Sequence, residues 1–240
     1  FTNPRTGAAD LVIDPKNPEK IFAAMWEFRR WPWYFESGGE GSGLYISHDG
    51  GETWRESLAQ DGFPSGELGR IGLAVSPSDP EVVYALVEAE RSELLRSDNG
   101  GDTWVTISDE DGIAPRPFYY ADLRIDPVNE NRIYSLHGSI QVSEDKGQSF
   151  RTVVPSSLIH GDVQELWINP DDGRNMIMGN DGGLAFTRDG GVHWRFVENL
   201  TLAQFYHISL DDATPYNVYG GLQDNGSWFG PNTVWEDRGI

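Results

Sequence analysis

The octapeptide SHDGGETW, from Ser47 to Trp54, decides the fold, because the chain contains three more close variants of it. SDNGGDTW begins at Ser97, SEDKGQSF at Ser143 and TRDGGVHW at Thr187. Successive copies therefore start 50, 46 and 44 residues apart. A recurrence at a period of this size indicates a repeat architecture.

Each octapeptide has the composition of a β-hairpin turn. Apolar and polar residues alternate on both sides of it, as in half-buried strands. An Asp or Asn side chain accepts backbone N–H bonds from residues just ahead, and glycine adopts the positive φ that such turns need. The closing aromatic residue can anchor the hairpin against a neighbouring element. We therefore expect a structural role for four positions in each copy: Ser47, Asp49, Gly51, Trp54, Ser97, Asn99, Gly101, Trp104, Ser143, Asp145, Gly147, Phe150, Thr187, Asp189, Gly191 and Trp194.

A second recurrence precedes each hairpin. An apolar strand ends in Asp, Ser or Asn followed by Pro, a polar turn follows, and a second apolar strand leaves it. A fifth copy, at residues 208–221, has the same form without an octapeptide after it. Each complete unit thus holds four short strands. This pattern predicts an all-β fold, a β-propeller segment of four-stranded antiparallel blades.

The expected organisation is one propeller segment over residues 1–240. Its blades cover about 9–58, 70–108, 121–154 and 164–198, with a partial fifth blade at 206–240 that contains only its first two strands. Such an array leaves unpaired edges, whereas propellers normally close into a circle. We therefore expect an open fan, in which Phe1 and Ile240 do not pair, excised from a longer chain of several propellers.

Composition excludes several classes of function. The net charge of −20 argues against a nucleic-acid partner, which requires a basic face. The chain has no cysteine, no nucleotide-binding glycine motif and no apolar run long enough to span a membrane. Acidic turns at 109–112 and 169–173 lack the spacing of a calcium loop. We predict no cofactor and no metal site.

The repeats resemble Asp-box repeats, the hairpin signature shared by sialidases, xyloglucanases and the sortilin extracellular domain. Beyond the octapeptides, the segments at 67–77 (ELGRIGLAVSP), 116–127 (RPFYYADLRIDP), 179–184 (GNDGGL) and 204–228 resemble large bacterial proteins described as sortilin-like or glycosyl-hydrolase-like. The resemblance implies an extracellular or periplasmic protein of greater length. Relatives carry a histidine-rich run before the fourth unit. Here HGDVQEL keeps His160 and Asp162 but lacks the later histidines, so no metal role follows.

The strand order predicts which loops share an end of the blades. Turns alternate between the two ends in a four-stranded meander, so the Pro turns and the Asp-box turns lie together. The longer second-to-third loops and the blade crossovers lie at the opposite end, where ligand binding is expected. Candidate ligand-binding residues on these loops are Trp26, Trp31, Trp33, Tyr34, Tyr119, Tyr120, His160, Asn180, Tyr206, Gln223, Asn225 and Trp228.

The aromatic loop at residues 26–43 has two interpretations. Its flat rings can stack on the pyranose rings of a carbohydrate. Alternatively, the loop packs against a neighbouring propeller of the same chain. We favour the second interpretation here, because six aromatic residues exceed what one binding subsite needs.

Asp181 and Asp224 occupy corresponding loops of the fourth and fifth units and are the candidate catalytic pair of a glycoside hydrolase. Both also stand next to glycines, as residues that cap turns do, which is the interpretation we favour. Two functions remain. The first is a sortilin-like binding or scaffold propeller for a glycan or peptide. The alternative is a xyloglucanase-like enzyme that cleaves polysaccharide with two carboxylates.

Overall fold

The computed structural model describes residues 3–110, 112–119, 122–154, 160–200, 202–223 and 225–233. Five antiparallel sheets follow one another in chain order, and within these ranges the helical structure is one 3-10 turn at Ala59–Asp61. This confirms the predicted all-β class with four-stranded antiparallel sheets. None of the described residues forms a helix long and apolar enough to cross a membrane.

Each of the first four sheets is a meander of strands that pair with their sequence neighbours. The first sheet contains β1 (Thr6–Ile13), β2 (Ile21–Trp31), β4 (Gly43–Ser47) and β5 (Arg55–Glu56), with β3 (Tyr34–Ser37) paired to the end of β2. The second contains β6 (Ile71–Val75), β7 (Val83–Val87), β8 (Glu93–Ser97) and β9 (Val105–Ser108). The third contains β10 (Asp122–Asp126), β11 (Asn129–Leu136), β12 (Ile140–Ser143) and β13 (Arg151–Thr152). The fourth contains β14 (Val163–Ile168), β15 (Met176–Asn180), β16 (Gly183–Thr187) and β17 (Arg195–Phe196).

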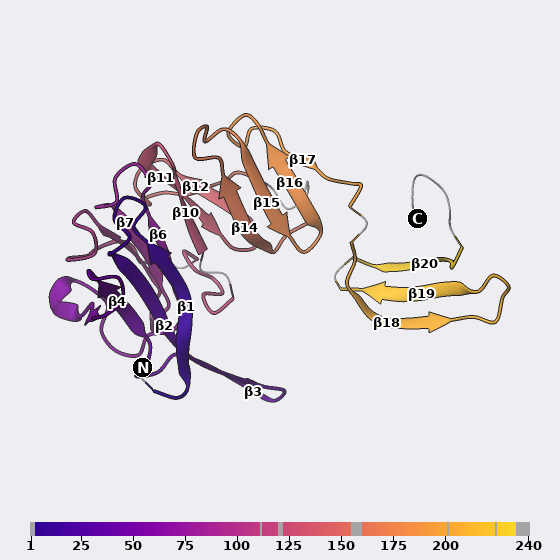
Figure 1. Cartoon of the computed structure of the whole chain (residues 1–240), viewed down its shortest axis with the longest axis horizontal. Coiled ribbons are helices and arrows are strands. Elements are labelled where there is room, and N and C mark those ends of the chain that lie inside the picture. The colour runs from indigo at the N-terminus through magenta and orange to yellow at the C-terminus, as the bar shows by residue number, and fades with distance from the viewer. Residues whose placement is uncertain are drawn as a thin grey trace.

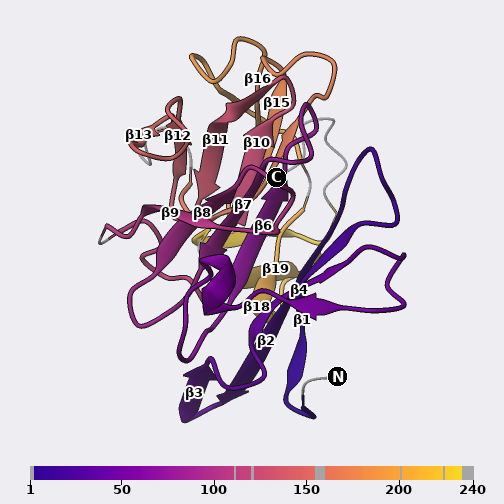
Figure 2. The same ribbon diagram turned by 90° about the vertical axis from the view of Figure 1, so that its left-hand side faces the viewer.

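The sheets stack face to face as a fan, and the first strands β1, β6, β10 and β14 lie next to one another along its inner side (Figures 1 and 2). Alternate side chains of a strand fill the spaces on its two faces. In β7, Val83 belongs to the core cluster that contains Phe22 of the first sheet, whereas Tyr84 belongs to the cluster that contains Ile133 of the third. The core therefore lies between sheets, and each pair of neighbouring sheets encloses its own apolar layer.

Backbone hydrogen bonds show which loops share an end of the blades. In every four-stranded sheet, an amide of the Asp-box turn donates to a carbonyl of the Pro turn. The bonds join Gly50 to Glu19 (2.9 Å), Gly100 to Glu81 (2.7 Å), Lys146 to Asn131 (3.0 Å) and Gly190 to Arg174 (3.0 Å). Both kinds of turn therefore lie at one end, called the turn end, as the strand order predicts. The longer loops occupy the opposite, loop end.

Two expectations about individual elements were wrong. The fifth unit has three strands, because the segment SWFGP folds back on β19 as a third strand; the sheet contains β18 (Phe205–Leu210), β19 (Asn217–Leu222) and β20 (Ser227–Pro231). The aromatic loop of the first unit is largely a hairpin, in which β2 runs on to Trp31 and pairs with β3. The predicted pairing behaviour of Phe1 and Ile240 lies outside the described residues.

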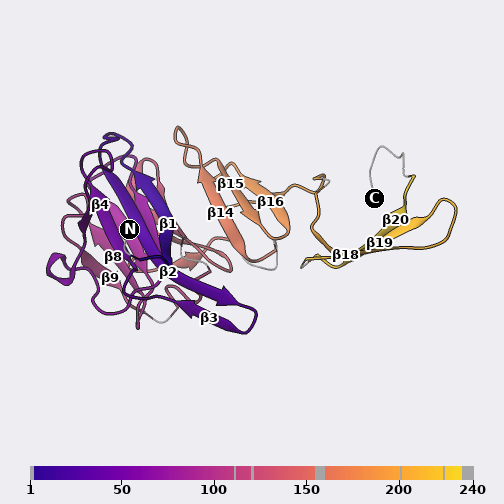
Figure 3. The same cartoon turned by 60° about the horizontal axis from the view of Figure 1, so that its bottom comes forward.

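The fifth sheet stands apart from the fourth beyond a connecting segment (Figures 1 and 3). Its strands pair with one another but make no extensive contact with the other strands of the described ranges. Ile208 is 61% exposed, although Leu166, at the corresponding position of β14, is 1% exposed. On the fourth sheet, Trp167 and Ile177 are exposed on the face where a following blade belongs. The last interface of the fan is thus open.

Candidate functional site

The Asp-box turn is a closed set of hydrogen bonds. The Ser47 hydroxyl donates to Asp49 Oδ1 (2.8 Å) and accepts from the Gly51 amide (2.8 Å). Asp49 also accepts from the Thr53 amide (2.9 Å) and the Thr53 hydroxyl (2.5 Å). These bonds to the ionised carboxylate, led by that from the Thr53 hydroxyl, lower the pKa of Asp49 to about 2. Both oxygens of the carboxylate thus accept bonds from within the turn.

The other three copies repeat this arrangement. Asp145 and Asp189 accept the corresponding bonds, and each has a pKa of about 2. Asn99 keeps the amide bond from Thr103 (2.9 Å) and donates to the Thr103 hydroxyl (2.8 Å) instead of accepting from it. Hydroxyls at the first position play the same part throughout: Ser47, Ser97, Ser143 and Thr187.

The glycine and the aromatic residue of each box connect it to its surroundings. Gly101, at φ +90°, lies so close to the preceding sheet that a Cβ would be 2.7 Å from Ile46 Cδ1. Gly51, Gly147 and Gly191 have similar positive φ. Of the closing aromatics, Trp104 is buried against Phe63 (ring centroids 5.5 Å apart), and Phe150 and Trp194 pack partly buried against core clusters. Trp54 remains half exposed, with its indole N–H bonded to the Gly51 carbonyl (2.9 Å). The turn end is a scaffold.

The loop end carries an arm, which we define as the hairpin of residues 28–37. Strand register places Arg30 opposite Phe35 and Trp31 opposite Tyr34, so these two pairs lie on opposite sides of the hairpin. Phe35 packs against Phe118 in the β9–β10 loop, with ring centroids 4.7 Å apart. Arg30 therefore faces that loop as well. The arm projects from the body of the sheets in Figures 1 and 3.

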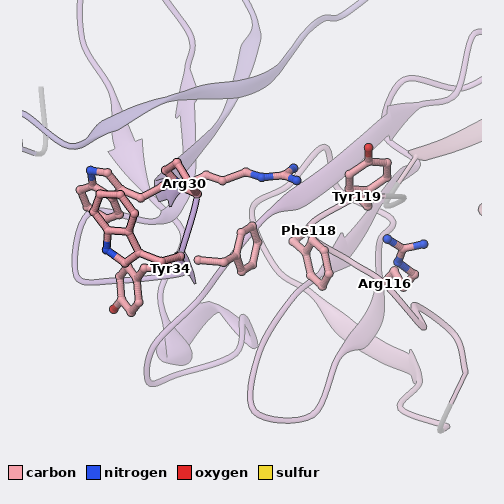
Figure 4. Close-up of a pocket in the computed structure, with 9 residues that line it drawn as sticks. Arg30, Tyr34, Arg116, Phe118 and Tyr119 are labelled. Atoms are coloured by element: carbon pink, nitrogen blue, oxygen red, sulfur yellow. The ribbon is translucent and has the colours of Figure 1, made fainter. Parts of the chain in front are cut away.

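A pocket of about 450 Å³ opens between the arm and the β9–β10 loop. Figure 4 shows Arg30 extending from the arm toward Tyr119, with Phe118 and Arg116 on the facing wall. The Arg116 guanidinium lies over the rings of Tyr119 (5.0 Å) and Phe118 (6.0 Å). The complete lining is Arg30, Trp31, Pro32, Trp33, Tyr34, Phe35, Arg116, Phe118 and Tyr119.

Four of the predicted ligand-binding residues meet in this pocket: Trp31, Trp33, Tyr34 and Tyr119. Trp26 lies at the base of the arm, where its indole N–H donates to Ser37 Oγ (3.0 Å) and its ring contacts Phe28 (4.3 Å). The predicted Tyr120 is outside the described residues. Sequence reasoning left Arg30, Phe35, Arg116 and Phe118 out of the candidate site. Strand alternation about the Pro32–Trp33 turn would have placed the first two on one side of a hairpin.

A second group of predicted residues gathers where the fourth and fifth units approach each other. Asn180 donates to the His160 carbonyl (2.7 Å) and accepts from the Gly182 amide (2.9 Å). Asp181 Oδ1 accepts from Gln164 Nε2 (3.1 Å), and the Asp181 carbonyl accepts from Asn225 Nδ2 (2.9 Å). These contacts are those of a bonded loop, and they leave Asp181 on the surface.

The remaining candidates of the fifth unit are spread over an open sheet. The Gln223 amide donates to the Gln204 carbonyl (3.0 Å), and the Gln223 carbonyl accepts from Asn225. Tyr206 and Trp228 are exposed. Asp224, the second member of the predicted catalytic pair, is outside the described residues, so its separation from Asp181 stays a prediction.

Charged side chains along the inner strands form a group that the sequence analysis did not identify. Asp10 accepts the Leu73 amide across the first interface (3.0 Å), and its pKa is raised, chiefly because burial removes water from the carboxylate. Arg70 pairs with Asp122 (3.1 Å). Arg124 on β10 donates to Glu165. Only the three-dimensional stacking of the first strands brings these residues together.

Comparison with known proteins supports the class that the boxes define. The family model of the BNR/Asp-box repeat matches residues 45–56, which contain the first octapeptide. No curated protein matches the sequence. Together with the solved structures that share its fold, the match identifies an Asp-box β-propeller segment that resembles xyloglucanase-like proteins.

Among solved structures, the GH74 enzyme of Niastella koreensis aligns with 92% of this chain at 21% identity and a TM-score of 0.52. The GH74 xyloglucanase of Xanthomonas campestris aligns with 93% at 16% identity and a TM-score of 0.59. YCF48 from Cyanidioschyzon merolae aligns with 97% at 19% identity and a TM-score of 0.56. The chain spans 29% and 35% of the two GH74 enzymes and 70% of YCF48. At these identities the likeness concerns the fold.

Proposed function

We propose that this chain is a ligand-binding propeller segment whose pocket, between the arm and the β9–β10 loop, binds an oligosaccharide. The observation that carries the proposal is that some aromatic residues of the arm hold it in place, whereas others are exposed at its tip. Phe28 contacts Trp26 and Phe35, and Phe35, although 40% exposed, contacts Phe118, so these rings hold the arm in place. Trp31 and Tyr34 contact only each other (ring centroids 5.5 Å apart) among the ring contacts of the described residues, and both are exposed at the tip together with Trp33.

The number of aromatic residues no longer favours an interface with a neighbouring propeller over a sugar site. Six aromatic residues exceed the need of one subsite, but three of them have a structural task. The three exposed rings line the pocket and match a platform for one or two sugar units; Trp31 and Tyr34 belong to the side of the hairpin opposite Arg30, so Trp33 at the turn is the ring best placed to share a ligand with Arg30. Trp33, which is 81% exposed, offers the largest accessible ring surface of the three. Covering about 100 Å² of apolar ring surface contributes roughly 2.5 kcal/mol before the cost of immobilising the ligand.

A peptide is the other ligand that the fold admits. One solved structure is that of YCF48 bound to D1 peptide, and another is that of a GH74 xyloglucanase. Neither ligand transfers to this chain through a shared fold. The exposed indole rings favour the sugar, because a peptide-binding groove of this kind would need a longer strand edge than the four residues of β3. We propose an extracellular or periplasmic location, where such glycans occur.

The test is an array of plant and bacterial polysaccharides, scored for binding and for release of reducing sugar. Binding by the unmodified protein that falls at least tenfold in Trp33→Ala supports the proposal. The control is Trp54→Ala, which removes a half-exposed indole at the turn end, far from the pocket. An equal loss in both variants, or the absence of any bound polysaccharide, contradicts it.

Hydrolysis ranks second. An inverting glycosidase requires two carboxyl groups roughly 6.5–9.5 Å apart, one of them able to donate a proton. Asp181 is held by Gln164 on an open loop, which offers little apolar cover for such a proton donor. We expect Asp181→Asn to leave polysaccharide binding unchanged. Reducing-sugar release by the unmodified protein that disappears in Asp181→Asn would reverse the ranking.

A further inference from the structure

We infer that the pocket selects sugars that carry a carboxylate, that is, uronic acid units. This inference rests on the proposed oligosaccharide site and assigns its chemical class. It depends on two guanidinium groups on opposite walls of the pocket, Arg30 from the arm and Arg116 from the β9–β10 loop.

The direction of Arg30 follows from the hairpin register. Arg30 and Phe35 are opposite each other and share one side of the arm, and Phe35 contacts Phe118. The Arg30 side chain consequently extends across the pocket toward Tyr119 (Figure 4). A ligand lying between the two walls meets this guanidinium.

Arg30 differs from the other arginines near the arm. Arg5 pairs with Glu27, and Arg29 donates to the carbonyls of Phe28 (2.8 Å) and Arg5 (3.3 Å). Within the described part of the chain, the Arg30 side chain makes neither a hydrogen bond nor an ion pair. The arm thus presents an exposed guanidinium whose donors are available to a ligand.

The second guanidinium adds positive charge to the facing wall. Arg116 lies over the rings of Tyr119 and Phe118, which hold its positive charge at this wall of the pocket. A guanidinium fork matches the two oxygens of a carboxylate, and such charge-assisted bonds are about twice as strong as neutral ones. A hydroxyl of a neutral sugar would use only part of the donor set of Arg30.

The overall charge makes this location selective. The chain carries a net charge of −20, so most of its surface repels an acidic polymer. Aromatic rings alone would accept neutral and acidic sugars alike. The two arginines supply the additional free energy that favours the acidic sugar at this one place.

The experiment compares two ligands of equal size, trigalacturonic acid and its methyl ester, by calorimetric titration of the full chain. We expect the acid to bind about tenfold more tightly than the ester. Equal affinities for both ligands overturn the inference and leave the proposed sugar site standing. Binding of neither ligand, while neutral polysaccharides bind, overturns the inference as well. Binding of no sugar at all removes the proposed function with it.

The variants are Arg30→Gln and, as the matched control, Arg29→Gln, which removes the same charge from the other side of the same hairpin. Arg30→Gln should lower the affinity for the acid about tenfold and leave that for the ester unchanged. Arg29→Gln should change neither by more than about twofold. A loss of the same size in both variants, or an equal loss for both ligands, contradicts recognition of the carboxylate by Arg30. Unchanged near-ultraviolet circular dichroism verifies that each variant folds.

Discussion

At the scale of single residues, the Asp-box carboxylates act on the chain itself and not on a ligand. Asp145 accepts from the Ser143 hydroxyl (2.7 Å), the Ser149 amide (2.9 Å) and the Ser149 hydroxyl (2.6 Å). The second box achieves the same turn with Asn99. An amide is therefore a sufficient replacement for the carboxylate in this geometry, and the natural sequence contains its own control.

Replacement of Asp145 by alanine should lower the free energy of unfolding by about 1 kcal/mol, because local side-chain-to-backbone bonds are lost. Replacement by asparagine should cost much less at neutral pH. Urea unfolding at pH 7 measures both changes. Sugar binding should be the same in both variants, since the box lies at the turn end. A binding defect specific to Asp145→Ala would contradict the scaffold role.

The same pair of variants predicts a pH dependence. The pKa of Asp145 is about 2 in the folded chain and has an ordinary value of 3.8. A lowered pKa means that the carboxylate stabilises the fold above its ordinary value and that this contribution is lost as the pH falls toward 2. Asp145→Asn should therefore flatten part of the decline in stability between pH 4 and pH 2, measured by urea unfolding at several pH values. An unchanged slope contradicts the bonded carboxylate.

Asp10 should behave in the opposite way. Its pKa is raised above the ordinary 3.8, chiefly by burial, so its ionised form is less favourable in the folded than in the unfolded chain. Its destabilising effect appears as the pH rises through the ordinary value and persists above the raised one. Asp10→Asn keeps an acceptor for the Leu73 amide and removes the charge. We expect a higher melting temperature than that of the unmodified chain at pH 7, and a smaller difference near pH 3.5.

At the scale of elements, the boxes also set how closely one blade approaches the next. Gly147, at φ +92°, lies where a Cβ would be 2.6 Å from Leu94 Cδ2 and 3.2 Å from Ile133 Cδ1. Gly147→Ala should therefore cost about 1–2 kcal/mol for the left-handed backbone and a further amount for the displaced core. Gly66→Ala is the control, because Gly66 has φ +97° and open space around it. Equal losses of stability in the two variants would argue against this packing role.

Strand alternation and turn residues sufficed to predict the blades, because both are local properties of the sequence. The third strand of the fifth unit was missed because no octapeptide follows it in the sequence. Trp228 and Phe229 were therefore assigned to a loop. The arm was missed for a related reason. Its two-residue turn is Pro32–Trp33 instead of a glycine-containing pair, so residues 26–43 were interpreted as an irregular loop.

The candidate site could be predicted only in part. Aromatic residues on a long loop are visible in the sequence, and three of the predicted ones line the pocket: Trp31, Trp33 and Tyr34. The opposite wall comes from a crossover some 80 residues later, and its contact with Phe35 depends on how far the arm reaches. The charges of the inner strands are likewise joined across sheets, as Arg124 is to Glu165. Non-local contacts of this kind leave no pattern in a single sequence.

At the scale of the whole molecule, the sheets differ greatly in how well they are buried. The first four share apolar clusters with their neighbours. All six residues of β18 are exposed, and the faces of Trp167 and Ile177 on the fourth sheet lack a covering layer among the described residues. Regions with few buried contacts open at the lowest free energy.

Limited proteolysis should therefore cut first in the connection between β17 and β18, at residues 197–204, and leave the first four sheets intact. Mass spectrometry of the early fragments identifies the site. Hydrogen exchange gives an independent measurement, in which amides of β18 and β19 should exchange well before those of β7 and β11. Early cleavage within the first three sheets, or strong protection of β19, would contradict this order.

The restriction of strand pairing to strands of the same sheet has a mechanical consequence. Main-chain hydrogen bonds join strands of one unit, whereas neighbouring units adhere mostly through side chains. A pull on the two ends of the chain would load these side-chain interfaces first and would tear the fan one unit at a time, beginning with the fifth sheet. A unit that loses its neighbour and then unfolds would release a length set by the repeat, 44 to 50 residues, so the molecule would yield under tension in regular steps.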